Sequence, residues 1–229
     1  MSVQQSILVV AGLAREARIA AGPGVEAIQA GGSPQRLRLL LDARDAPACG
    51  GVVSFGIAGG LDPVLRPGDV VIATGIVAGA ERWAADARWT TRLQDRLALA
   101  GGRVVAADLA GVDAAILAVS DKAALHSATA AAAVDMESHV AAAYAARHRL
   151  PFAAIRVVCD PAERALPAFA AQALKPNGDP DIPAVLRALM TGRAKPRDLI
   201  GLARDSSAAF KALAACRAAL GDGLGLSTT

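Results

Sequence analysis

Carboxylates stand at both ends of one predicted helix–strand unit in the second half of the chain. Asp135-Met136-Glu137 opens this unit, an Ala-rich helix follows to about Arg149, and an apolar strand from Phe152 to Cys159 leads into Asp160. Ligands of open α/β sheets bind beyond the carboxyl ends of the strands, so Asp160 is predicted to lie at such a crevice. Two carboxylates facing one sugar can support cleavage of a glycosidic bond. The alternative is that Asp160 only caps a turn or a helix.

Glycines follow two predicted strands and allow the backbone to approach a ligand closely. Gly12 follows the first strand, and Glu16 lies one turn into the next helix. A second run, Gly56 to Gly60, follows another strand but is neither a dinucleotide-binding fingerprint nor a P-loop. A tight turn is an equal alternative for the second run. For Glu16 the alternative is an ordinary solvated first-turn acid, which the helix dipole favours.

The composition limits the class of protein. The chain has 229 residues, of which 54% are hydrophobic and only 3% aromatic, which predicts one domain with an aliphatic core. The net charge is +3, and the basic residues are scattered without interleaved aromatics, so no nucleic-acid partner is expected. The three cysteines and three histidines show no metal-ligand spacing, which predicts no metal, no cofactor and a reducing compartment.

No targeting segment or membrane span is predicted. The apolar stretch near the N-terminus is short and lacks a basic region before it. No run approaches the roughly 20 apolar residues of a membrane span. A cytoplasmic protein is therefore expected.

Strands alternate with helices along the first 161 residues, which predicts an α/β fold with a largely parallel sheet. The predicted strands cover residues 6–11, 25–30, 51–57, 70–77, 104–107, 115–119 and 152–159. The predicted helices cover residues 14–20, 34–44, 82–100 and about 138–149. The prediction is a single domain over residues 1–229, with a core at 1–161 and a helical C-terminal extension at 162–229.

The C-terminal extension is predicted to hold three helices, over residues 166–174, 182–190 and 196–220. In the last of these, Leu199, Leu202, Phe210 and Leu213 form an apolar stripe. Basic positions flank the stripe, at residues 197, 204 and 211. One interpretation is a helix that covers the sheet, and the other is a wall for an apolar ligand or a membrane surface.

Four blocks of sequence together resemble the nucleoside phosphorylase and nucleosidase superfamily. These blocks are Ile7 to Gly12 with Glu16, Gly56 to Leu61 with Pro67 to Val71, Val134 to Glu137, and Pro151 to Asp160. The last two are similar to methylthioadenosine/S-adenosylhomocysteine nucleosidases. The run from Leu166 to Leu174 resembles the hopanoid-associated phosphorylases, which are assigned to removing adenine from adenosylhopane.

This resemblance implies a three-layer fold, with a mixed, twisted sheet between helices, and roles for particular residues. Asp160 would be the general acid that protonates adenine at N7, and Glu16 would hold and activate a nucleophilic water. Glu137 would bind the ribose hydroxyls, and Met136 would pack against the sugar.

The resemblance also implies further substrate contacts. Gly12 and Ile57 would line the site, and the backbone near Ala124 and Cys159 would read the adenine edge. Nucleosidases have an adenine-stacking Phe near Ala123, so base recognition here departs from the family pattern.

The nucleophile is predicted from a second departure. Phosphorylases of the superfamily bind phosphate with Arg-x-Gly-Ser where this chain has Ser54-Phe55-Gly56-Ile57, which favours water over phosphate. Arg15 remains an alternative phosphate ligand.

The predicted function is release of adenine from a 5′-substituted adenosine, with adenosylhopane as the expected substrate. The alternatives are a methylthioadenosine/S-adenosylhomocysteine nucleosidase, a purine nucleoside phosphorylase, and a non-catalytic nucleoside-binding module. A homo-oligomer and a peripheral contact with the inner membrane face are also expected.

Overall fold

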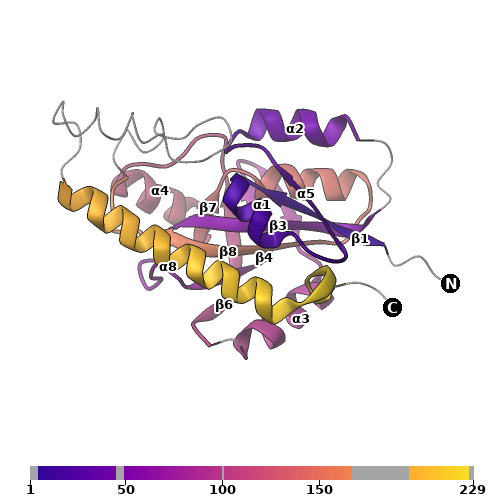
Figure 1. The fold of residues 1–229 in the computed structure, drawn as a ribbon. Helices are drawn as coiled ribbons and strands as arrows, with labels where there is room; N and C mark the ends of the chain where they lie inside the picture. The colour runs from indigo at the N-terminus through magenta and orange to yellow at the C-terminus, as the bar shows by residue number, and fades with distance from the viewer. Residues whose placement is uncertain (1–4, 45–48, 100, 167–195, 227–229) are drawn as a thin grey trace.

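A mixed sheet lies between helices in the computed structural model, which describes residues 5–44, 49–99, 101–166 and 196–226 (Figure 1). The strands are β1 Ser6–Ala11, β2 Val25–Gln29, β3 Cys49–Gly60, β4 Val70–Ala78, β5 Glu81–Ala84, β6 Val104–Gly111, β7 Ala133–Asp135 and β8 Phe152–Asp160. The helices are α1 Ala14–Ala20, α2 Pro34–Asp42, α3 Ala87–Ala98, α4 Val119–Thr129, α5 Ser138–Arg147 and α8 Pro196–Leu220. A 3-10 turn, Asp222–Gly225, follows α8.

Five strands of the sheet close into a ring. The main order is β2-β1-β3-β7-β6-β4-β5, and β8 pairs with both β3 and β4. The ring therefore runs β3-β8-β4-β6-β7 and back to β3, with β3–β7 and β4–β8 antiparallel and the other three pairs parallel. This closure leaves β2 and β5 as the edges of the described sheet.

Alternate residues along the strands face two different layers of helices, as the pleat requires. On β8, Ala154 and Val158 join the core beneath α2 and α5. Ile155 and Val157 join the core that α3 and α8 cover on the other side. The predicted α/β class with helices on both faces of a mixed sheet is confirmed, and Figure 1 shows the layers.

Several predicted elements differ in the structure. The strand expected at 115–119 is absent: Ala118 is extended but unpaired and precedes α4. The helix expected at 82–100 begins only at Ala87, because residues 81–84 pair with β4 as β5. The glycine run at 56–60 is not a loop, since β3 continues through Gly60. The helices predicted at 166–174 and 182–190 lie outside the described residues, apart from Leu166.

Helix α8 packs its apolar stripe against the sheet. Phe210 and Leu213 are buried, with 5% and 0% of their surface exposed, in the core that includes β8. The guanidinium of Arg15 on α1 stacks over the Phe210 ring at 4.0 Å. For these residues the interpretation of a helix covering the sheet holds, and they offer no surface to a lipid. No helix in the described ranges has the length and apolarity needed to cross a bilayer.

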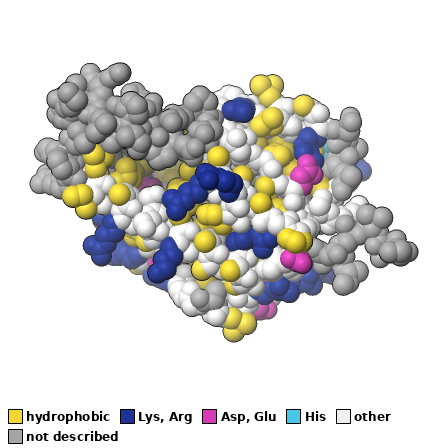
Figure 2. Space-filling view, viewed as in Figure 1, with side chains coloured by type: hydrophobic (Ala, Val, Ile, Leu, Met, Phe, Trp, Pro, Cys, Tyr) yellow, Lys and Arg dark blue, Asp and Glu magenta, His cyan; other side chains and the backbone are white. Residues whose placement is uncertain are grey.

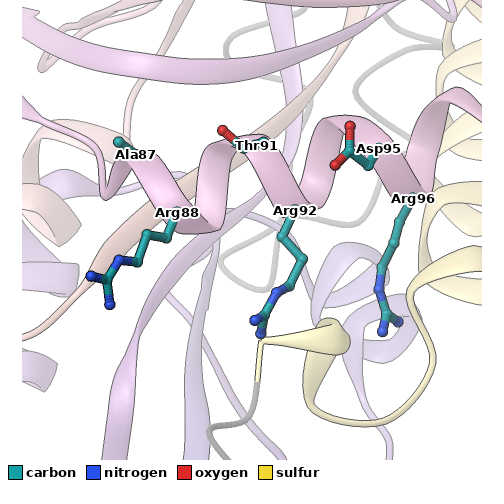
Figure 3. Close-up of a pocket in the computed structure, with 6 residues that line it drawn as sticks. All are labelled: Ala87, Arg88, Thr91, Arg92, Asp95 and Arg96. Atoms are coloured by element: carbon teal, nitrogen blue, oxygen red, sulfur yellow. The ribbon is translucent and has the colours of Figure 1, made fainter.

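Basic side chains are spread over the surface. Helix α3 presents Arg88, Arg92 and Arg96 on successive turns, around a shallow open depression (Figure 3). Arg96 donates to the carbonyl of Leu220 and thereby fastens α3 to the end of α8. On the face seen in Figure 2, Lys and Arg side chains lie in several separate places among hydrophobic ones. The prediction of no nucleic-acid partner stays a prediction.

The packing of α8 predicts a large effect of one truncation. Leu213→Ala removes a fully buried side chain from the α8–sheet core, and we expect the free energy of unfolding to fall by about 2–5 kcal/mol. Leu99→Ala is the matched control, since Leu99 is 89% exposed and should change stability by less than about 0.5 kcal/mol. Urea denaturation measures both. A small effect of Leu213→Ala would contradict the role of α8 as part of the core.

Candidate active site

A fully buried arginine on β8 lies at the centre of the charged residues. Arg156 donates through Nε to Ser138 Oγ at 3.3 Å, through Nη1 to the Ile57 carbonyl at 3.2 Å and through Nη2 to Ser54 Oγ at 2.5 Å. The same Nη2 lies 3.2 Å from the carboxylate of Asp135 and 3.4 Å from that of Glu137. A buried guanidinium needs such partners, because an unpaired charge in the interior is strongly destabilising.

The acidic cluster at the start of α5 has two separate tasks. Asp135 Oδ1 accepts hydrogen bonds from the backbone N–H groups of Glu137 and Ser138, at 2.8 and 2.6 Å. This carboxylate therefore satisfies free N–H groups at the helix start, as a cap does. The turn that it fixes directs Glu137, which is 5% exposed, toward Arg156.

Glu16 joins the start of α1 to β3. Its Oε2 accepts from the Leu13 N–H and its Oε1 from the Ile57 N–H, both at 2.7 Å. The side chain is 1% exposed, so it is not the solvated first-turn acid of the alternative interpretation. The Ile57 backbone thus donates to Glu16 and accepts from Arg156, and it links the two charged groups.

Glu137 and Glu16 each lie so close to a backbone position that only glycine fits there. A Cβ on Gly12 would lie 2.6 Å from Glu137 Oε1. A Cβ on Gly56 would lie 2.5 Å from Glu16 Oε1 and 2.7 Å from Arg156 Nη1. Real side-chain contacts are not that short, so these glycines serve the packing of the acids rather than a tight turn.

Asp160 ends β8 just beyond an irregularity in the strand. The register with β3 pairs Ala58 with Val158 and then Gly59 with Asp160, so Cys159 is an extra, bulged residue. Bulges re-aim the side chains that follow them. Asp160 is 6% exposed, and its Oδ2 accepts a short hydrogen bond from the ammonium of Lys122 on α4.

Burial raises the pKa of all three candidate acids, Glu16, Glu137 and Asp160, because the charged form loses its hydration. The pKa of Glu137 reaches about 8: burial is the main cause, Arg156 opposes it, and the neighbouring Asp135 and Glu16 carboxylates add to it. The cluster around Arg156 therefore retains a proton near neutral pH.

The other predicted site residues have different surroundings. Met136 is half-buried between the two acids of the cluster. Ala124 is exposed in the middle of α4, where its backbone N–H belongs to the helical ladder. Cys159 is a buried thiol, whose pKa burial raises to about 12. Arg15 stacks on Phe210, on the side of α1 that faces α8.

Two buried cations were not selected from the sequence. Arg156 lay within a block that resembled the family, but nothing in a strand sequence shows which side chain meets three acids. Lys122 sits in a segment without strong amphipathic character, so its burial had no sequence signal. Within the described ranges, no three His, Cys, Asp or Glu side chains are grouped as metal ligands would be.

The fold and the buried acids define an α/β protein with buried charged residues on and beside a closed ring of strands. The model of the Phosphorylase superfamily matches residues 38–178, more than half of the chain, and the chain therefore belongs to this superfamily. The expected superfamily is confirmed, and with it the expectation of an enzyme. A search of curated proteins found no match.

Solved structures share the fold at low sequence identity. The 5′-methylthioadenosine/S-adenosylhomocysteine nucleosidase of Neisseria meningitidis, in complex with methylthio-immucillin-A, has a TM-score of 0.68 at 17% identity, over 94% of this chain and 97% of that one. The corresponding Helicobacter pylori nucleosidase, with butyl-thio-DADMe-immucillin-A, has a TM-score of 0.65 at 15% identity, over 93% and 97%. Futalosine hydrolase of Helicobacter pylori has a TM-score of 0.65 at 14% identity, over 92% and 96%. These likenesses establish the fold.

The raised pKa of Glu137 predicts a pH-dependent stability. A carboxyl whose folded pKa lies above its unfolded value stabilises the fold when protonated, and this contribution is lost as pH rises toward about 8. Glu137→Gln cannot ionise, so its melting temperature should fall less between pH 6 and pH 9 than that of the wild type. Glu163→Gln, at an exposed position, should follow the wild type. Equal falls in Glu137→Gln and wild type would refute the assignment.

Proposed function

We propose that the chain is an N-ribosyl hydrolase that releases adenine from a 5′-substituted adenosine. The observation that carries this proposal is a set of buried acids around β8: Glu137 contacts Arg156 and Glu16 lies within the field of that arginine. A third acid, Asp160, ends the same strand. Membership of the Phosphorylase superfamily supports it. A nucleoside-binding module would not need three acids with raised pKa values, and such groups are typical of acid–base sites.

On the base side, Asp160 is proposed as the general acid. The electron pair of the bond from C1′ to N9 moves onto the purine as this bond breaks, and a proton from Asp160 on N7 neutralises it. A general acid must be protonated near the working pH. Burial raises the pKa of Asp160 and so favours the protonated form.

On the sugar side, Glu137 is proposed to hydrogen-bond the ribose hydroxyls, with Met136 packed against the ring. Cleavage builds positive charge at C1′, which an ionised carboxylate on the sugar side can stabilise. Glu16 is proposed to hold the attacking water and to take its proton as the new C–O bond forms. The products are then adenine and the 5′-substituted ribose.

Water is the proposed nucleophile because the site is already anionic. Arg156 is surrounded by the carboxyls of Asp135, Glu137 and Glu16, which act on it together. Ser54, at the position where phosphorylases have a phosphate-binding arginine, hydrogen-bonds to Ser138 and accepts from Arg156. Arg15, the alternative phosphate ligand, stacks on Phe210. A phosphate dianion placed beside these carboxyls would add negative charge to an acidic cluster whose arginine is already paired.

Adenosylhopane is the proposed substrate, on the strength of the sequence resemblance in residues 166–174. The buried part of the α8 stripe gives this substrate no support, since Phe210 and Leu213 serve the core. The competing substrate is methylthioadenosine, because a Helicobacter pylori nucleosidase with the same fold holds 5′-methylthioadenosine in its active site.

Asp160→Asn tests the general acid. The amide keeps the shape of the side chain but cannot protonate N7, so turnover should fall by about 10²–10⁴-fold. Adenine release is measured by absorbance, beside Asp95→Asn on the exposed face of α3 as the matched control. Near wild-type turnover in a folded Asp160→Asn would remove this residue from the proposed role.

Substrate and nucleophile are tested together on the wild type. Adenosylhopane and methylthioadenosine are each incubated with and without inorganic phosphate, and products are identified by mass spectrometry. We expect free ribosyl product without phosphate and faster cleavage of adenosylhopane. A sugar 1-phosphate formed only with phosphate would refute hydrolysis. Faster cleavage of methylthioadenosine would end the lipid assignment.

A further inference from the structure

One fully buried cation, Lys122 on α4, takes no part in the chemistry described so far. Its ammonium donates to Asp160 Oδ2, to the Pro161 carbonyl at 2.9 Å and to the Arg164 carbonyl at 3.0 Å. An ammonium has three N–H donors, and these three acceptors use all of them. The hydrogen-bond pattern therefore fits the charged form of the lysine, held in one orientation.

The ammonium of Lys122 contacts one of the two carboxyl oxygens of Asp160, Oδ2. A proton on that oxygen would point at a group that has only donors. A protonated Asp160 must then carry its proton on Oδ1. The two carbonyls belong to the turn that leaves β8, so the same ammonium also fixes the backbone on which the carboxyl stands.

We propose that Lys122 is a positioning residue for the general acid: by occupying Oδ2 of Asp160, it confines the transferable proton to Oδ1, the oxygen left for the departing base. This inference rests on the proposed function. The proton passes from Oδ1 to N7, the electron pair of the broken C1′–N9 bond stays on the purine, and Asp160 is left as a carboxylate. Lys122 stabilises that carboxylate through its contact with Oδ2.

The charged and titratable groups around Asp160 come from α4, from β8 and the segment after it, and from α8. Lys122 belongs to α4, and the neighbouring Cys159 thiol belongs to β8. Arg164 follows β8, and its guanidinium is paired with Asp205 of α8. Burial raises the pKa of Asp160, and Lys122 is the main group that lowers it. The lysine thus makes Asp160 a stronger acid, and it also lowers the fraction of Asp160 that is protonated at alkaline pH.

Lys122→Met tests this inference through the pH dependence of turnover. Without the ammonium the pKa of Asp160 should rise, so the alkaline limb of the kcat profile should move up by about 1–3 pH units. On the low-pH plateau, where both enzymes hold a protonated Asp160, the variant should be slower, because its acid is weaker. Lys122→Gln, which keeps one donor for Asp160, supplies the same comparison if Lys122→Met does not fold. Lys211→Met, at an exposed position of α8, should match the wild type.

A second substrate separates this role from a purely structural one. A 4-nitrophenyl riboside with the same 5′ group releases nitrophenolate, which leaves without protonation. Lys122→Met should cleave it at close to the wild-type rate. An unshifted alkaline limb, or equal losses on both substrates, would overturn the inference while wild-type adenine release upheld the proposed function. No adenine release by the wild type would overturn both.

Discussion

The pairing of one buried guanidinium with several carboxyls is the interaction on which the rest of this site depends. Arg156 has no exposed surface, and hydroxyl, carbonyl and carboxylate groups from β3, β7 and the start of α5 surround it. Glu137 contacts it directly, and the field of the arginine also reaches Glu16. Removing Arg156 would leave acids buried without their cation, which is strongly destabilising. The same charge distribution that secures the fold therefore sets the protonation of the site.

A second constraint is space at the ends of the strands. The carboxyl of Glu16 occupies the space that a Cβ on residue 56 would need, and the carboxyl of Glu137 occupies the space that a Cβ on residue 12 would need. Gly56 lies on β3, and Gly12 directly follows β1, the neighbour of β3 in the sheet. Further along β3, a Cβ on Gly59 would lie 3.2 Å from Asp160 Oδ2. Helices on both faces then exclude water, which is why the carboxyl pKa values rise. The order of the strands, the glycines and the covering helices therefore together set the pKa values of the buried carboxyls.

The sequence was sufficient for the alternating elements and for the position of Asp160 at a strand end, because both follow from local periodicity and from proline and glycine. It was insufficient for β5, where helix-favouring residues pair with β4 and tertiary context overrides propensity. Strand β7 has only three residues, too few for a periodic signal. Lys122 was missed because its partners, Asp160 and the turn after it, lie about 40 residues further along the chain. Burial of that kind is decided by topology rather than by neighbours in sequence.

The position of β8 between β3 and β4 has a consequence for the order in which the molecule forms. Val52 of β3 pairs with Phe152, and Val70 of β4 pairs with Val157. Strands β3 and β4 therefore gain this neighbour only after about 100 further residues have been synthesised. Contacts between such distant segments are slow to form, because long loops must close first. Arg156 and Asp160 both travel on this strand. A chain still emerging from the ribosome therefore has one edge of β3 and one edge of β4 unpaired, and it lacks Arg156 and Asp160. Insertion of β8 pairs both edges and brings both charged residues into place in the same step.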